Sequence, residues 1–90
     1  MIIITNDVDA PNMTRNIHID VRMDGCIITM TSATANSYSV EGKWEQINDP
    51  EWMYEQFKYE YLVVFKGLAE MLSKIIDNKQ TYLDLVSSGT

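Results

Sequence analysis

The sequence predicts an α+β domain in which a three- or four-stranded antiparallel sheet packs on one long C-terminal helix. Residues 17–23 alternate strictly between apolar and polar side chains, and a second β-prone run at 26–33 follows after Asp24-Gly25. From about residue 50 to 77 the apolar side chains recur at the helical period instead. A chain of 90 residues is enough for one hydrophobic core, so residues 1–90 are expected to form a single domain.

The first expected strand is the opening stretch MIIIT, whose three consecutive isoleucines are typical of a buried strand. The following residues, NDVDAPN, contain the Asn, Asp and Pro that favour a turn. The pattern does not place this strand within the sheet.

A β-hairpin formed by 17–23 and 26–33 is the clearest local prediction. Asp24-Gly25 is the dipeptide that supplies positive φ at both central positions of a type I′ turn. A two-residue loop at these positions fixes the register of the two strands. It predicts the inward-facing pairs Met23–Cys26, Val21–Ile28, Ile19–Met30 and Ile17–Ser32.

A third pairing strand is expected after the hairpin. Tyr38 and Val40 alternate there with Ser37, Ser39 and Glu41. The strand either ends near Gly42 or continues to Trp44.

The long helix, about 50–77, has recognisable ends. Asp49 is a favoured N-cap, Pro50 suits the first helical position, and Asn78 can adopt the left-handed conformation that ends a helix. Gly67, in the middle, costs up to about 1 kcal/mol relative to Ala, which implies either a bend or a close approach by another backbone. KQTYLDLV, beyond Asn78, has the composition for one or two further turns.

At about 100° per residue, one broad face of this helix is apolar and is expected to cover the sheet. It comprises Tyr54, Phe57, Tyr61, Val64, Leu68, Met71, Leu72 and Ile75, with Phe65 and Ile76 at its edge. The opposite face is an ordinary solvated one, with Lys66, Glu70, Lys74 and Asp77.

Three apolar side chains fit neither face. Trp52, Tyr59 and Val63 are spaced by seven and four residues, so a straight helix places them in one outward stripe. Trp and Tyr in such a position are typical interface anchors. We therefore expect a partner-binding surface formed by the stripe and its polar neighbours, namely Glu51, Trp52, Glu55, Gln56, Tyr59, Glu60 and Val63. The stripe has three possible covers: the C-terminal segment of the same chain, a second copy in a homodimer, or another protein.

The residues do not predict an enzyme. The chain has one Cys and one His, and the hairpin register puts Cys26 on the inner face and His18 on the outer face, which separates them. Structural zinc needs four such ligands, and the four glycines stand apart, so no phosphate-binding loop is present. No cofactor and no metal are expected. A single cysteine also fits a reducing compartment.

The net charge of −6 favours a basic partner. The seven Lys and Arg are scattered singly, so direct binding of nucleic acid is not expected. The longest apolar run, YLVVF, is five residues against the roughly 20 that span a bilayer, so neither a membrane nor export is expected and a cytoplasmic location is predicted. The same net charge is also ordinary for small soluble domains, which leaves solubility as a second explanation.

In size, charge and general build, the chain is similar to small acidic inhibitors from phages and mobile elements, including anti-CRISPR proteins. That similarity implies a non-catalytic interaction module that occupies a basic, nucleic-acid-binding surface of a larger protein, with carboxylates in the place of phosphates. The alternative is a structural or assembly protein, or a small subunit, that homo-oligomerises through the helix.

Overall fold

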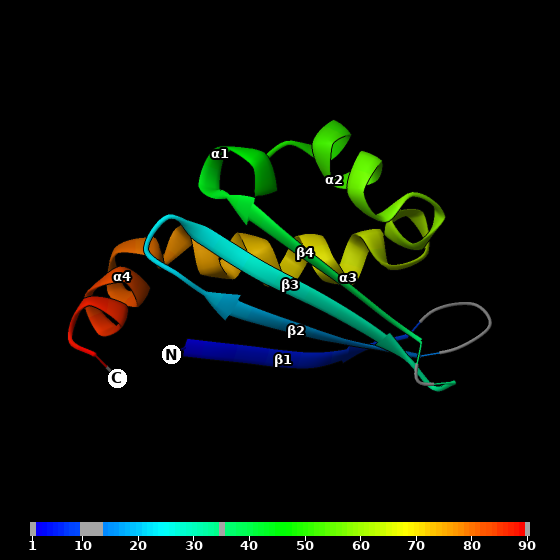
Figure 1. Ribbon diagram of the computed structural model, residues 1–90, viewed down its shortest axis with the longest axis horizontal. Helices are drawn as coiled ribbons and strands as arrows, with labels where there is room; N and C mark the ends of the chain where they lie inside the picture. Colours follow the sequence, from blue (N-terminus) through cyan, green and yellow to red (C-terminus); the bar gives the residue numbers. More distant parts are fainter. Residues whose placement is uncertain (1, 10–13, 35, 90) are drawn as a thin grey trace.

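The computed structural model describes residues 2–9, 14–34 and 36–89, and it shows an α+β protein with helices on one face of an antiparallel sheet (Figure 1). The strands of the described residues are β1 (Ile2–Val8), β2 (Arg15–Val21), β3 (Gly25–Ser32) and β4 (Ser37–Lys43). They lie in the order β1-β2-β3-β4, and every neighbouring pair is antiparallel. The helices are α1 (Trp44–Ile47), α2 (Pro50–Phe57), α3 (Tyr59–Asp77) and α4 (Lys79–Ser87). The predicted fold class is confirmed.

The hairpin forms, but its predicted register is wrong by two residues. Val21 pairs with Cys26 rather than with Ile28, and the loop is Met23-Asp24, closed by the N–H of Arg22 donating to the carbonyl of Gly25 at 2.8 Å. A shift of two keeps the side chains that remain in the strands on their predicted faces, because the side-chain period of a strand is two. The predicted ends at 17–23 and 26–33 move to 15–21 and 25–32, and Met23, expected inside, is 54% exposed in the loop.

Gly25 is needed for space and not for a turn. Its φ is not positive, and it pairs with Lys43 of β4 while the next residue, Cys26, pairs with Gly42. A Cβ atom on Gly25 would overlap the carbonyl oxygen of Gly42 and lie 2.7 Å from the Cα of Lys43. The local turn signal was therefore outweighed by a close backbone contact with a strand further along the chain.

The first strand lies at an edge of the sheet, paired with β2 alone among the described strands. Ile2 and Ile4 pack against the core, whereas Ile3 points to the outer face and is exposed. The expectation of a fully buried strand is wrong, because helices cover only one face of the sheet. The third pairing strand is confirmed as β4, which ends at Lys43, and α1 begins at Trp44.

The single long helix expected over about 50–77 is two helices. Its start is confirmed, since Asp49 Oδ1 accepts the N–H of Glu51 at 3.0 Å and Pro50 is the first helical residue. At Lys58 the backbone adopts φ 54° and ψ −130°, and α3 begins again at Tyr59. A non-glycine residue in this region costs roughly 1–3 kcal/mol. The turn lets α2 fold back so that Met53 and Phe57 are buried, and burial of two such side chains contributes a comparable or larger amount, about 1.5–3 kcal/mol each.

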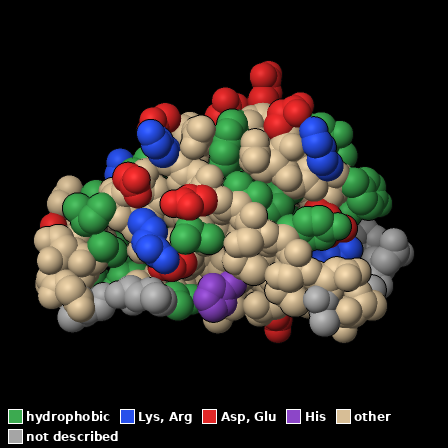
Figure 2. Space-filling view, in the orientation of Figure 1, with side chains coloured by type: hydrophobic (Ala, Val, Ile, Leu, Met, Phe, Trp, Pro, Cys, Tyr) green, Lys and Arg blue, Asp and Glu red, His purple; other side chains and the backbone are tan. Residues whose placement is uncertain are grey.

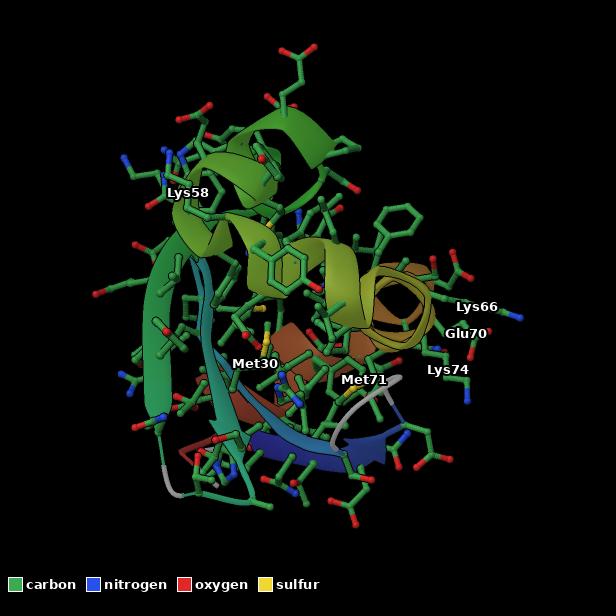
Figure 3. All side chains as sticks on the ribbon, turned by 90° about the vertical axis from the view of Figure 1, so that its right-hand side faces the viewer. Met30, Lys58, Lys66, Glu70, Met71 and Lys74 are labelled. Atoms are coloured by element: carbon green, nitrogen blue, oxygen red, sulfur yellow. The ribbon has the colours of Figure 1, made fainter. Side chains whose placement is uncertain are left out.

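The core lies between the sheet and α3. Figure 3 shows Met30 and Met71 between the two layers, while Lys66, Glu70 and Lys74 point away from them. The predicted apolar face of the helix is buried at Phe57, Tyr61, Val64, Leu68, Met71, Leu72 and Ile75. Tyr54 is the exception: it is 41% exposed, and Met53 takes the inner position because α2 has turned.

The last two elements close the far end of the molecule. Helix α3 ends at Asp77, as expected, but the left-handed conformation expected at Asn78 is wrong, since its φ is −113° and its ψ 22°. The further turns predicted after Asn78 are α4. Helix α4 contacts α3, β1 and β2, and its Tyr82 and Val86 pack against the core. It lies at the opposite end of the molecule from α2 (Figure 1).

Candidate functional site

The turn at Lys58 leaves an apolar groove between α2 and α3. Three large side chains are open to solvent here: Leu62 is 60% exposed, Phe65 47% and Tyr54 41%. One hollow of about 590 Å³ is lined by Asp49, Pro50, Glu51, Trp52, Tyr54, Glu55, Tyr61 and Leu62. A second of about 160 Å³ is lined by Ile47, Asn48, Pro50, Tyr61, Phe65, Ala69, Leu72, Ser73 and Ile76. Because both share Pro50 and Tyr61, we treat them as one site, the α2–α3 groove.

Tyr61 forms the floor where the two hollows meet. Its side chain is buried, and its ring meets that of Phe65 edge to face, with 5.4 Å between centroids and 82° between planes. Burial raises the pKa of the Tyr61 phenol, so the group is neutral at physiological pH. The groove therefore has an uncharged aromatic floor at Tyr61 with the exposed ring of Phe65 packed against it, which suits an apolar ligand surface.

Carboxylates rim the α2 side of the groove. Asp49 caps α2, Glu51 follows in its first turn, and Glu55 lies one turn later, with Glu55 also pairing with Lys58 at 3.0 Å. Both partners of that ion pair are largely exposed, so it restrains Glu55 only weakly. Figure 2 shows acidic side chains gathered along the top of the molecule, over α1 and α2.

The structure divides the predicted partner-binding residues. Glu51, Trp52 and Glu55 line the groove. Trp52 is half-buried, packs against the core and lies over Gly42, where a Cβ would come within 2.8 Å of its ring. Gln56 is exposed on α2 but does not line the groove.

The remaining three predicted residues lie past the turn and outside the groove. Tyr59 is 67% exposed. Val63 packs against the core. Glu60 accepts from Arg15 at 2.9 Å in a partly buried ion pair that joins α3 to β2. The prediction of one continuous stripe through Trp52, Tyr59 and Val63 is wrong, because the positive φ at Lys58 breaks the helical phase between the first residue and the other two.

Cover of the stripe by the C-terminal segment is also wrong. Helix α4 packs at the other end of α3, and Tyr59 remains open to solvent. The residues that sequence reasoning missed are Tyr54, which was expected in the core, and Leu62. The signal for Leu62 was present in its spacing of three from Phe65 and seven from Ala69, but it is visible only when α3 is treated as a separate helix.

Cys26 and His18 lie on opposite faces of the sheet. Cys26 is 1% exposed on the inner face, and burial raises the pKa of its thiol to about 12, so no thiolate forms at neutral pH. His18 lies on the outer face between Thr5 and Thr29, its pairing partners in β1 and β3. The predicted separation of the two side chains is confirmed.

Within residues 2–9, 14–34 and 36–89, no three His, Cys, Asp or Glu side chains come together in a way that could hold a metal ion. None of the described helices combines the length and apolar character needed to cross a bilayer.

Comparison with known proteins gives no relative to reason from. No protein family, no curated protein and no solved structure matches the chain significantly.

Proposed function

We propose that the protein is a non-catalytic interaction module that binds a larger protein with a basic surface through the α2–α3 groove. The observation that carries the proposal is the exposure of Tyr54, Leu62 and Phe65 around the buried ring of Tyr61, beside a rim of carboxylates. Three large apolar side chains are exposed in one concave surface of a small domain. A partner that covers this surface would remove them from water. Each such side chain contributes about 1.5–3 kcal/mol when it is fully removed from water.

The carboxylates of the rim favour a partner with a positively charged surface. Asp49, Glu51 and Glu55 lie on one wall, and the chain as a whole carries a net charge of −6. Such a surface accelerates encounter with Lys- and Arg-rich partners and disfavours acidic ones. A protein surface that normally holds a phosphate backbone fits this description, so we further propose an inhibitory role of the phage or mobile-element kind, including the anti-CRISPR kind, in which carboxylates compete with phosphates.

Affinity capture in the native host tests the proposal with three matched chains. The wild type and a control, Met23→Ser, should capture the same partner, because Met23 is an exposed apolar residue in the β2–β3 loop outside the groove. Phe65→Ser should lose it. The complex should also weaken as salt rises, because the rim interaction is screened. Equal capture by Phe65→Ser and the wild type would contradict the proposal.

The oligomeric state separates this proposal from assembly through the helix. Sedimentation at micromolar concentration should give a monomer. A dimer that is lost in Phe65→Ser but kept in Met23→Ser would show that a second copy fills the groove, and would favour the structural or assembly role instead.

A further inference from the structure

Helix α3 carries a buried apolar stripe against the sheet and a second apolar stripe beside it, which is exposed at Leu62 and Phe65 and buried at Leu72. The inner stripe contains Val64, Leu68, Met71 and Ile75, all buried. The second stripe, which we call the seam, has spacings of three, four, three and four and consists of Leu62, Phe65, Ala69, Leu72 and Ile76. A repeat of this kind is the a/d pattern by which one helix packs along another.

The seam lies in the α2–α3 groove. All five of its residues line one of the two hollows, and the opposite wall is formed by Ile47, Pro50, Trp52 and Tyr54. Leu62 and Ile76 are 14 positions apart, which is about 21 Å along the helix at 1.5 Å per residue. The groove therefore offers an apolar track roughly four helical turns long, exposed at Leu62 and Phe65 and with buried Leu72 in its floor. The small side chain of Ala69 lies at its centre, where another backbone can approach closely.

We propose that the segment captured by this groove is an amphipathic α-helix of the partner, basic on the flank that faces α2. This inference rests on the proposed function and specifies the form of its ligand. A helix satisfies its own backbone hydrogen bonds, whereas an extended segment would bring unpaired N–H and C=O groups against apolar side chains. Helix-in-groove binding is an established mode in which anchors repeat at i, i+3, i+4 and i+7, which matches the spacing of the seam.

The charges on the two sides of the seam determine which flank of the ligand helix faces α2. Asp49, Glu51 and Glu55 lie on the α2 wall. On the other side, the neighbouring hollow on α3 shares Phe65 and Ala69 with the seam and carries Lys66 and Lys74 together with Glu70 and Asp77, so its charges balance. Lys or Arg is therefore favoured on the flank of the ligand helix against α2, whereas the flank against α3 carries no preference for one sign of charge.

Three synthetic peptides of about three heptads each test the inference against the full chain. The first has Leu at the a and d positions and Lys or Arg at most others. The second has the same composition in an order that destroys the heptad, and the third keeps the heptad but replaces Lys and Arg with Glu. We expect the first to bind at least about 10-fold more tightly than either of the others, measured by fluorescence anisotropy. That corresponds to about 1.4 kcal/mol.

Variants of the groove residues test whether the first peptide binds in the α2–α3 groove. Phe65→Ser and Leu62→Ser should each weaken the first peptide at least about 10-fold, the loss expected when one well-packed apolar anchor is removed. Met23→Ser should leave its affinity unchanged. Both groove residues are exposed, so the variants should remain folded, which circular dichroism checks. If one of them unfolds, the other still decides the question.

The outcomes distinguish this inference from the proposed function. Equal binding of the ordered and the reordered peptide overturns the helical ligand and leaves a basic partner at the groove in place. Equal binding of the basic and the acidic heptad peptide overturns the assignment of charge. No binding of any peptide, together with partner capture that Phe65→Ser abolishes, overturns this inference alone, whereas capture that ignores Phe65→Ser overturns both.

Discussion

The contact between Gly67 of α3 and Val8 of β1 allows a mutation in which two physical effects have opposite signs. Gly67→Ala should stabilise a helix interior by about 1 kcal/mol through propensity. In this structure, however, the new Cβ would lie 2.5 Å from Val8 Cγ1, 2.7 Å from Cγ2 and 3.2 Å from Cβ. All three atoms are too close, so rotation of the Val8 side chain cannot relieve the overlap. Overpacking of this kind costs about 1–3 kcal/mol.

The net expectation is that Gly67→Ala lowers the free energy of unfolding by up to about 2 kcal/mol, instead of raising it by about 1 kcal/mol. Urea denaturation measures it directly, and in a domain of this size each kcal/mol also shifts Tm by roughly 4–8 °C. The contact explains the glycine that the sequence left ambiguous: the close approach is made by a side chain, not by another backbone.

Val8→Ala provides the matched control. It removes both Cγ atoms, so Gly67→Ala in the Val8→Ala background should be neutral or stabilising by up to about 1 kcal/mol. The coupling between the two sites should then be about 1–3 kcal/mol. If Gly67→Ala stabilises the wild type as much as it stabilises Val8→Ala, the packing of α3 against β1 is not as described.

Three further predictions concern other parts of the fold. Because the pKa of the Cys26 thiol is about 12 when folded against an ordinary 9.0, the unfolded chain releases this proton first and stability falls as pH rises above 9. The loss from this group is about 1.4 kcal/mol between pH 7 and 10, and Cys26→Ala, measured at both values, should remove that part of the difference. Gly42→Ala should cost about 1–3 kcal/mol in urea denaturation, since its Cβ would lie 2.8 Å from the Trp52 ring and 2.9 Å from Ile47. Glu60→Gln should cost about 1 kcal/mol at low salt and less at high salt, because its ion pair with Arg15 is only partly buried. An effect of Glu60→Gln that does not depend on salt would contradict the electrostatic explanation.

The strands were predictable because their side-chain period is local information. The alternation in 17–23 fixed which residues of β2 face inward, and every one of Ile17, Ile19 and Val21 is buried. The register was not predictable from Asp24-Gly25, because it depends on the approach of Gly25 to Gly42, two residues separated by most of β3 and β4. The fold class survives such an error, since a shift of two residues leaves the core face unchanged.

The candidate site was only partly predictable, and the reason is Lys58. Nothing in QFKYEY marks a helix end, as there is neither Gly nor Pro. The break is favoured by the burial of Met53 and Phe57, which is tertiary information. Carried across the break, the helical phase placed Tyr54 inside and joined Trp52 to Tyr59. Glu51, Trp52 and Glu55, which the sequence grouped together, do line one hollow, because all three lie on α2, before the turn.

The groove exists only because the chain turns at Lys58 between α2 and α3. The most direct test of this turn compares the free energy of unfolding of Lys58→Gly with that of Lys58→Ala. Both variants remove the ion pair with Glu55, which leaves backbone conformation as the difference between them. At φ 54° and ψ −130°, Gly should be more stable than Ala by about 1 kcal/mol, because it has no Cβ to oppose a positive φ. In an unbroken helix the order is reversed, with Gly less stable by about 1 kcal/mol. That reversed order would contradict the two-helix arrangement and with it the groove.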